Sequence, residues 1–264
     1  MIVSCLMQSN GLAAGDPSPK SGLGTLSLVS VGTGDPDNMT IRARKTIAAA
    51  DIFFTMGGRS ERYGDLLQGK PVHNAEHGLF GKGGAKPRIS AEGAEILRRE
   101  NRQIIREAVA AGKNVVILDN GDPTIFGPQI GYLREFADLN PVIVPGLSSF
   151  NAANAALKTS VVGGSGRAVM LTSASLKDGR DKFLAETIKN GVTLAFFMVR
   201  NLNEFIAALQ VHLPKDMPVA IVAEAGSATN ERVIVADLDT ILARVGQEKL
   251  PPFLVYVGDF LRDR

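Results

Sequence analysis

Three glycine-containing segments of the chain stand where a parallel sheet would hold a small molecule. They lie at 31–36, 120–123 and 145–149, and each follows a short apolar run. In open α/β sheets, ligands bind beyond the carboxyl ends of the strands, where glycine lets the main chain approach closely. One glycine after a strand is more often a plain turn. Three such segments, each followed by a predicted helix, indicate a small-molecule site.

The common nucleotide-binding motifs do not fit these segments. The phosphate-loop pattern GxxxxGK[ST] does not occur in the chain. Gly32-Thr33-Gly34 supplies only the first pair of glycines of the dinucleotide fingerprint GxGxxG. Standard triphosphate and dinucleotide binding is therefore disfavoured.

The elements that would position these segments alternate between strand and helix in the first half of the chain. Apolar runs predict strands at 26–31, 51–56, 114–118 and 141–144. Helical spacing predicts helices at 41–50, 90–111 and 127–137, and another that opens within 145–149 and ends at 156. The glycine-rich, basic stretch at 57–88 is too irregular for regular structure throughout, and loops this long are usually functional or mobile. The alternation favours a mostly parallel sheet covered on both faces.

The second half of the chain has a different rhythm. Strands are predicted at 167–172, 192–199, 218–223, 231–235 and 253–257, and helices at 180–189, 203–213 and 237–245. A Gly-Ser turn between 223 and 231 predicts a hairpin and hence a mixed sheet. The glycine-rich run at 163–166 marks the boundary between an N-terminal α/β domain at 24–162 and a C-terminal α/β domain at 163–264.

Composition excludes several other classes of protein. The net charge is +2 and the basic residues are spread along the chain, so there is no strong nucleic-acid signal. A single cysteine and three histidines in no metal-ligand spacing predict no metal site. No apolar run is long enough to cross a membrane. Residues 1–23 read as a disordered leader whose weak signal-like character leaves export open beside the expected cytoplasmic location.

In this order, the motifs resemble the tetrapyrrole (corrin and porphyrin) methylases. The glycine segments at 31–37, 121–127 (GDPTIFG) and 145–149 carry the N-terminal part of the resemblance. Its C-terminal part is carried by Phe197-Met198 and by the runs at 222–226, 231–233 and 251–258. The resemblance covers about 26–260, and the GDPxxxG pattern is its most specific element.

The resemblance implies a fold, a cofactor and a set of binding residues. It implies two α/β domains with a cofactor cleft between them, S-adenosyl-L-methionine folded in that cleft, a homodimer, and a role in porphyrin or cobalamin biosynthesis. Carried over position by position, the cofactor residues are Asn120, Gly121, Asp122, Ile125, Ser148, Ser149, Met198, Ala225 and Gly226.

The methyl acceptor implied by the resemblance is a small molecule, a tetrapyrrole. The usual first loop of the family, VGxGPGDP, is shortened here to Val31-Gly32-Thr33-Gly34-Asp35-Pro36, and 57–88 matches no corrin-pathway subgroup. The identity of the acceptor therefore stays open. The alternatives are a methyltransferase of the same scaffold for a peptide backbone or RNA, and a non-catalytic S-adenosylmethionine-binding protein.

The residues that would act on the acceptor are not identified by any motif. Arg59 and Tyr63 in the stretch 57–88 are candidates, because the planar fork of arginine suits the carboxylates of a tetrapyrrole. Asp35 is the acid of the shortened loop and is a further candidate without an assigned role. Arginines at 98, 99 and 102 are better explained as a solvated helix face.

Overall fold

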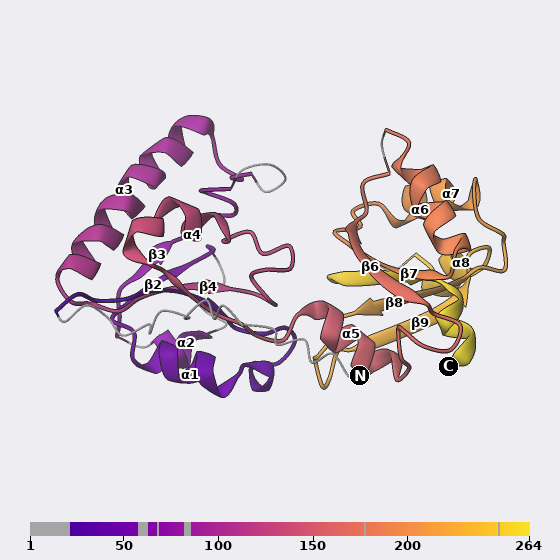
Figure 1. Ribbon diagram of the computed structural model, residues 1–264, viewed down its shortest axis with the longest axis horizontal. Helices are drawn as coiled ribbons and strands as arrows, with labels where there is room; N and C mark the ends of the chain where they lie inside the picture. Colours follow the sequence, from indigo (N-terminus) through magenta and orange to yellow (C-terminus); the bar gives the residue numbers. More distant parts are fainter. Residues whose placement is uncertain (1–21, 58–62, 68, 82–85, 177, 248) are drawn as a thin grey trace, which may run out of the picture.

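The computed structural model describes residues 22–57, 63–67, 69–81, 86–176, 178–247 and 249–264. These residues form two five-stranded sheets, each with its own covering helices (Figure 1). The first sheet contains the indigo to magenta strands and the second contains the orange and yellow ones. The predicted leader falls almost wholly on residues outside this description.

The first sheet is parallel throughout. Its strands are β1 (Leu26–Ser30), β2 (Ile52–Thr55), β3 (Val72–Asn74), β4 (Val115–Asp119) and β5 (Val142–Val144), in the order β3-β2-β4-β1-β5. Every residue of β1 and β4 is buried, as the continuous apolar runs predict for central strands. Because the strands are parallel, their carboxyl ends lie along one edge. We call this the carboxyl edge.

Helices cover both faces of the first sheet (Figure 1). On one face lie α3 (Ala91–Ala110) and α4 (Gly131–Glu135), and on the other lie α1 (Ile41–Ala48) and α2 (Gly64–Leu67). The two long helices begin at side-chain caps, since the hydroxyls of Thr40 and Ser90 accept hydrogen bonds from the backbone three residues on, each at 3.1 Å. The predicted alternation of strand and helix is confirmed.

The second sheet is mixed, as predicted. Its strands are β6 (Ala168–Ser173), β7 (Val192–Phe197), β8 (Pro218–Ala223), β9 (Arg232–Asp237) and β10 (Phe253–Val257), in the order β6-β7-β10-β8-β9. Only β6 and β7 pair in parallel, and β8 and β9 form the predicted hairpin. One face is covered by α6 (Arg180–Lys189), α7 (Leu202–Gln210) and α8 (Ile241–Val245).

Helix α5 (Ser149–Leu157) connects the two sheets. It follows β5 of the first sheet, yet its alanines pack on the free face of the second sheet, against Ala220, Val222 and Tyr256. The Tyr256 hydroxyl donates its one proton to Asn154 Oδ1 at 2.7 Å, with the Phe150 carbonyl as a second, longer acceptor at 3.2 Å. The domain boundary predicted at 163 stays a prediction, and this packing favours a boundary before α5.

Most elements lie within three residues of their predicted bounds, and three depart further from the predictions. Strand β3 was not predicted, because it is only three residues long and largely exposed, and pairing with β2 alone makes it a strand. Helix α4 is shorter than the predicted 127–137, because the chain makes turns at 123–126 and 128–130 and becomes helical only at Gly131. Helix α8 starts later than predicted, because Asp237 still belongs to β9.

None of the helices in the ranges above has the length and apolar character needed to span a bilayer.

The bonds made by Tyr256 generate a test of how α5 is held. Burial raises the pKa of Tyr256, so its hydroxyl remains a donor at all ordinary pH values. We expect Tyr256→Phe to lower the free energy of unfolding by about 1–3 kcal/mol, because part-buried acceptors on α5 lose their donor. Urea denaturation of this variant, of Asn154→Ala and of the double variant measures the coupling. Strictly additive effects would contradict the Tyr256–Asn154 bond.

Candidate functional site

The segments that follow β1 and β4 meet at the carboxyl edge. Gly32 and Gly121 form an isolated antiparallel bridge, in which the Gly121 amide donates to the Gly32 carbonyl at 2.8 Å. The Ser30 hydroxyl donates to the Gly121 carbonyl and accepts from the Gly32 amide at 3.1 Å. Two of the three predicted glycine segments are thereby joined into one surface.

The third segment, 145–149, lies against the other two. A Cβ on Gly146 would lie 1.9 Å from Ser30 Oγ, so only glycine fits there. Ser148 is buried and caps α5, with its Oγ accepting from the Asn151 amide at 3.3 Å. A Cβ on Gly121 would lie 3.8 Å from Ser148 Cα and equally far from Ser149 N. The structure therefore brings Gly121, Ser148 and Ser149 together.

Asp119 holds both ends of the segment that follows β4. It is buried, and its two carboxylate oxygens accept from the amide of Asn120 at 2.9 Å and of Gln129 at 3.1 Å. The predicted strand ends at Leu118 and leaves Asp119 out, whereas β4 includes it. A single acid at the end of an otherwise apolar run was the available signal. Asp119 makes the segment a closed loop of defined shape.

Within that loop, Asp122 organises a tight turn. Its Oδ1 accepts from Thr124 N at 2.8 Å and from Thr124 Oγ1 at 2.5 Å, while Ile125 N donates to the Asp122 carbonyl at 3.0 Å. In the described part of the chain, Oδ2 of Asp122 has no hydrogen-bond partner. This carboxylate oxygen remains available to a ligand.

The first loop is bonded to the β8–β9 loop of the second sheet. Gly34 has φ +68°, and a Cβ on it would lie 2.1 Å from the carbonyl carbon and oxygen of Gly226. Asp35 N donates to the Gly226 carbonyl at 2.9 Å, and Asn38 Nδ2 donates to the same oxygen at 2.7 Å. Asn38 Nδ2 also donates to the Thr33 carbonyl at 2.9 Å. We refer to this approach of the two main chains as the Gly34–Gly226 contact.

The carboxylate of Asp35 reinforces that contact. Its Oδ2 accepts from the Ala228 amide at 2.7 Å and its Oδ1 accepts from Ser227 Oγ at 3.2 Å. The Gly226 amide also donates to the Glu231 carboxylate at 2.9 Å. Both oxygens of Asp35 are thus engaged inside the protein. This arrangement favours a structural role for Asp35 over the catalytic one for which the sequence made it a candidate.

Apolar residues form the remainder of the candidate site. Ile125 packs against the same hydrophobic cluster as buried Ala225. Met198 directly follows β7, has φ +60° and is 56% exposed. Phe126 has φ +57°, and its ring lies 4.8 Å from that of Phe197 between centroids. Positive φ in residues other than glycine is uncommon and concentrates at functional sites.

Tyr63 and Arg59 have different outcomes. Tyr63 is buried, and its hydroxyl donates to Asn120 Oδ1 at 2.7 Å, so it belongs to the site through Asn120. Arg59 lies outside the described residues. Arg98 and Arg102 pair with Glu95 and Glu135 on the outer surface of the first sheet's helices, as a solvated face predicts.

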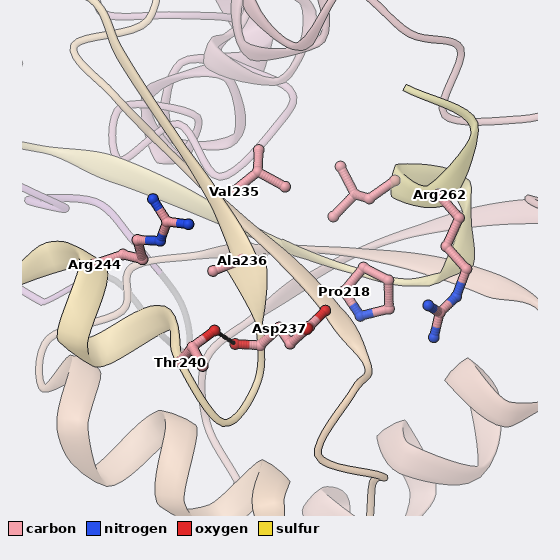
Figure 2. Close-up of a pocket in the computed structure, with 8 residues that line it drawn as sticks. Pro218, Val235, Ala236, Asp237, Thr240, Arg244 and Arg262 are labelled. Atoms are coloured by element: carbon pink, nitrogen blue, oxygen red, sulfur yellow. Dashed lines mark hydrogen bonds between the residues drawn. The ribbon is translucent and has the colours of Figure 1, made fainter.

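Two pockets lie in different parts of the molecule. One, of about 310 Å³, opens beside Tyr63 and is lined by Pro36, Met39, Arg44, Tyr63, Gly64, Asp65 and Leu66. The other, of about 450 Å³, lies where β8, β9, α8 and the last residues of the chain meet, flanked by Arg244 and Arg262 from opposite sides (Figure 2). The second pocket contains none of the predicted site residues. Among the residues described, no group of three His, Cys, Asp or Glu side chains is placed to hold a metal ion.

Sequence comparisons identify related proteins along most of the chain. The family model for tetrapyrrole (corrin/porphyrin) methylases matches residues 25–242. A uroporphyrinogen-III C-methyltransferase of Methanocaldococcus jannaschii is 29% identical over 249 residues, covering 89% of this chain and 96% of that protein. A siroheme synthase of Stutzerimonas stutzeri is 29% identical over 254 residues, covering 94% of this chain and 52% of that protein. The chain therefore spans about half the length of the siroheme synthases it matches.

Solved structures share the fold. A uroporphyrin-III C-methyl transferase from Thermus thermophilus, complexed with S-adenyl homocysteine, has a TM-score of 0.64 at 23% identity and covers 91% of this chain and 100% of that chain. A cobalt precorrin-4 methyltransferase has a TM-score of 0.66 at 20% identity and covers 90% of this chain and 95% of that chain. The predicted fold class is confirmed.

The Gly34–Gly226 contact predicts a large loss of stability in Gly34→Ala. An alanine there adopts a left-handed conformation at about 1–2 kcal/mol and forces two main chains apart at about 1–3 kcal/mol more. We expect the free energy of unfolding to fall by about 2–5 kcal/mol in urea denaturation.

Gly179→Ala is the matched control for that substitution. Gly179 has φ +76° and ψ +7°, in the left-handed region, and a Cβ added there would meet nothing within 4 Å. The loss of unfolding free energy in this control variant therefore measures only the cost of the left-handed backbone conformation. Equal losses in the two variants would show that the contact between the loops contributes nothing.

Proposed function

Because the chain belongs to the tetrapyrrole (corrin/porphyrin) methylase family, we propose that it transfers a methyl group from S-adenosyl-L-methionine to a tetrapyrrole. The observation that carries the proposal is the meeting of the three glycine segments at the carboxyl edge, next to the Gly226 loop. The uroporphyrinogen-III C-methyltransferase, matched along 96% of its length, supports the same activity. Siroheme synthases extend well beyond this chain, and their remaining activities form no part of the proposal.

We assign the cofactor to the nine residues predicted from the motifs. They are Asn120, Gly121, Asp122, Ile125, Ser148, Ser149, Met198, Ala225 and Gly226. The chemistry of this set fits a ligand with an adenosine end and an amino-acid end. Gly121 keeps the space beside Ser148 and Ser149 open, the free oxygen of Asp122 accepts hydrogen bonds, and the exposed Met198 and half-buried Ile125 offer apolar contact.

S-adenosyl-L-methionine, when bound, supplies an electrophilic methyl group on a sulfonium. The protein's task is then to align donor and acceptor and to exclude water. The rigid main chain at the carboxyl edge helps to align the two molecules, because Asp119 closes the loop that contains Asn120. In addition, Tyr63 orients the side chain of Asn120. Apolar Phe126 and Met198 serve the exclusion of water. None of these roles needs a strong base on the protein.

The methyl acceptor is proposed as a class of molecule rather than as one compound. The family and its relatives support a tetrapyrrole acceptor, with a role in porphyrin or cobalamin biosynthesis. The homodimer implied by the resemblance stays a prediction.

A label-transfer experiment tests the proposed activity. Protein is incubated with methyl-labelled S-adenosyl-L-methionine and, separately, with uroporphyrinogen III, a mixture of corrin precursors, short peptides or RNA. We expect label on a tetrapyrrole only. Label on peptide or RNA would move the chain to the alternative acceptors. Binding of S-adenosylhomocysteine without any transfer would leave a non-catalytic binding protein.

The role of Asp122 is tested by calorimetry with S-adenosylhomocysteine. Asp122→Ala removes both the turn-forming oxygen and the free one, so we expect affinity to fall roughly 10- to 100-fold, as for a hydrogen bond to a charged group. Asp122→Asn keeps an acceptor for Thr124 and should lose less affinity. Asp237→Asn, in the second pocket, is the remote control. An unchanged affinity in Asp122→Ala would remove this residue from the site.

A further inference from the structure

The 310 Å³ pocket beside Tyr63 has no role in the arrangement described so far. We propose that it binds one carboxylate-bearing pyrrole unit of the acceptor, with the Arg44 guanidinium holding the carboxylate. The inference rests on the proposed function, because it names the part of that site which receives the acceptor. It concerns Arg44, which no motif singled out.

The pocket lies next to the cofactor residues. One wall is Tyr63, whose hydroxyl donates to Asn120 Oδ1 at 2.7 Å. A second wall comes from Pro36 and Met39, which continue the first loop beyond the Gly34–Gly226 contact. A ring seated here is therefore one side chain removed from Asn120 and from the loop that carries Asp122.

Arg44 brings an available positive charge to this pocket. It lies on α1, it is exposed, and its side chain makes no ion pair or hydrogen bond within the residues that the structure describes. Arg102, Arg106 and Arg262, in contrast, are each paired with a carboxylate. An unpaired guanidinium at a pocket wall matches a carboxylate ligand, which it can bind through two parallel hydrogen bonds.

The rest of the lining fits a pyrrole ring. Met39, Leu66 and the Tyr63 ring are apolar surfaces suited to the faces of a ring. Asp65 is the acid of this lining and already has an interaction of its own. The N–H of a pyrrole ring can donate a hydrogen bond to a carboxylate. The volume, about 310 Å³, is at the lower end for ligand pockets, so it suits one ring with its acid side chain rather than a whole macrocycle.

Titration of uroporphyrin III, followed by fluorescence anisotropy, tests the inference. This stable porphyrin carries a carboxylate on every peripheral side chain. We expect Arg44→Gln to weaken its binding at least about tenfold and Arg44→Lys to recover part of the loss, because lysine keeps the charge but not the fork. A porphyrin with the same ring but cationic substituents is the ligand control. We do not expect Arg44→Gln to weaken the binding of this porphyrin.

Arg42→Gln is the matched control on the same helix. Arg42 is also exposed, and it does not line the pocket. Unchanged uroporphyrin binding in Arg44→Gln, or an equal loss in Arg42→Gln, would overturn the inference. Unmodified protein that binds S-adenosylhomocysteine but no uroporphyrin would also overturn it.

Binding of S-adenosylhomocysteine, measured in the same variants by calorimetry, separates this inference from the proposed function. We expect it to be unchanged in Arg44→Gln. If unmodified protein binds uroporphyrin through Arg44 but does not bind S-adenosylhomocysteine, the acceptor pocket stands and the proposed methyl transfer fails.

Discussion

The close approach of two main chains, at Gly34 and Gly226, is the constraint on which the rest of the site depends. Each loop follows a fully buried strand, β1 in one sheet and β8 in the other, and neither loop has room for a side chain at the point of contact. Hydrogen bonds from the Ala228 amide to Asp35 and from Asn38 to the Gly226 carbonyl then fix the separation of the loops. The carboxyl edge of the first sheet is thereby held against the second sheet by backbone, the least adaptable part of a protein.

Helix α5 is the second connection between the sheets, and it works by a different physical means. Its alanines allow close packing on β8 and β10, so the connection is mainly burial of apolar surface, with the Tyr256 hydroxyl adding direction. Its first turn lies beside Gly121, whereas its body lies on the second sheet. Of the residues proposed to bind the cofactor, Gly226 belongs to the first connection and Ser149 begins the second. Their positions thus depend on both sheets.

Sequence reasoning predicted the parts of this fold that depend on local pattern. Strands β8 and β10 and helix α6 have their predicted bounds, because each is a short run of one periodicity that ends at clear turn residues. The three glycine segments were predicted to share one edge, since parallel strands end together. Strand β3 could not be predicted, because its three residues carry too little apolar pattern.

The contacts between residues of the site could not be predicted from one sequence, because they join residues that are far apart along the chain. The partners of Tyr63 and Asp35 are 57 and 193 positions away along the chain, and nothing in the residue types reveals such pairings. In the sequence, both residues are therefore candidates for acting on the methyl acceptor. In the structure, each makes a hydrogen bond that orients another part of the site. The cofactor assignment itself came from the family resemblance, and it remains a proposal.

The two connections also bear on how the chain folds. Each sheet has its own hydrophobic clusters and, by size alone, would be a candidate for independent unfolding. A further cluster, however, combines α5 and Ile125 with strands of the second sheet. Losing the second sheet would therefore expose apolar surface of α5 and free the first loop from Gly226. The architecture therefore predicts that the two halves unfold together and that a ligand bound at the carboxyl edge would stabilise both.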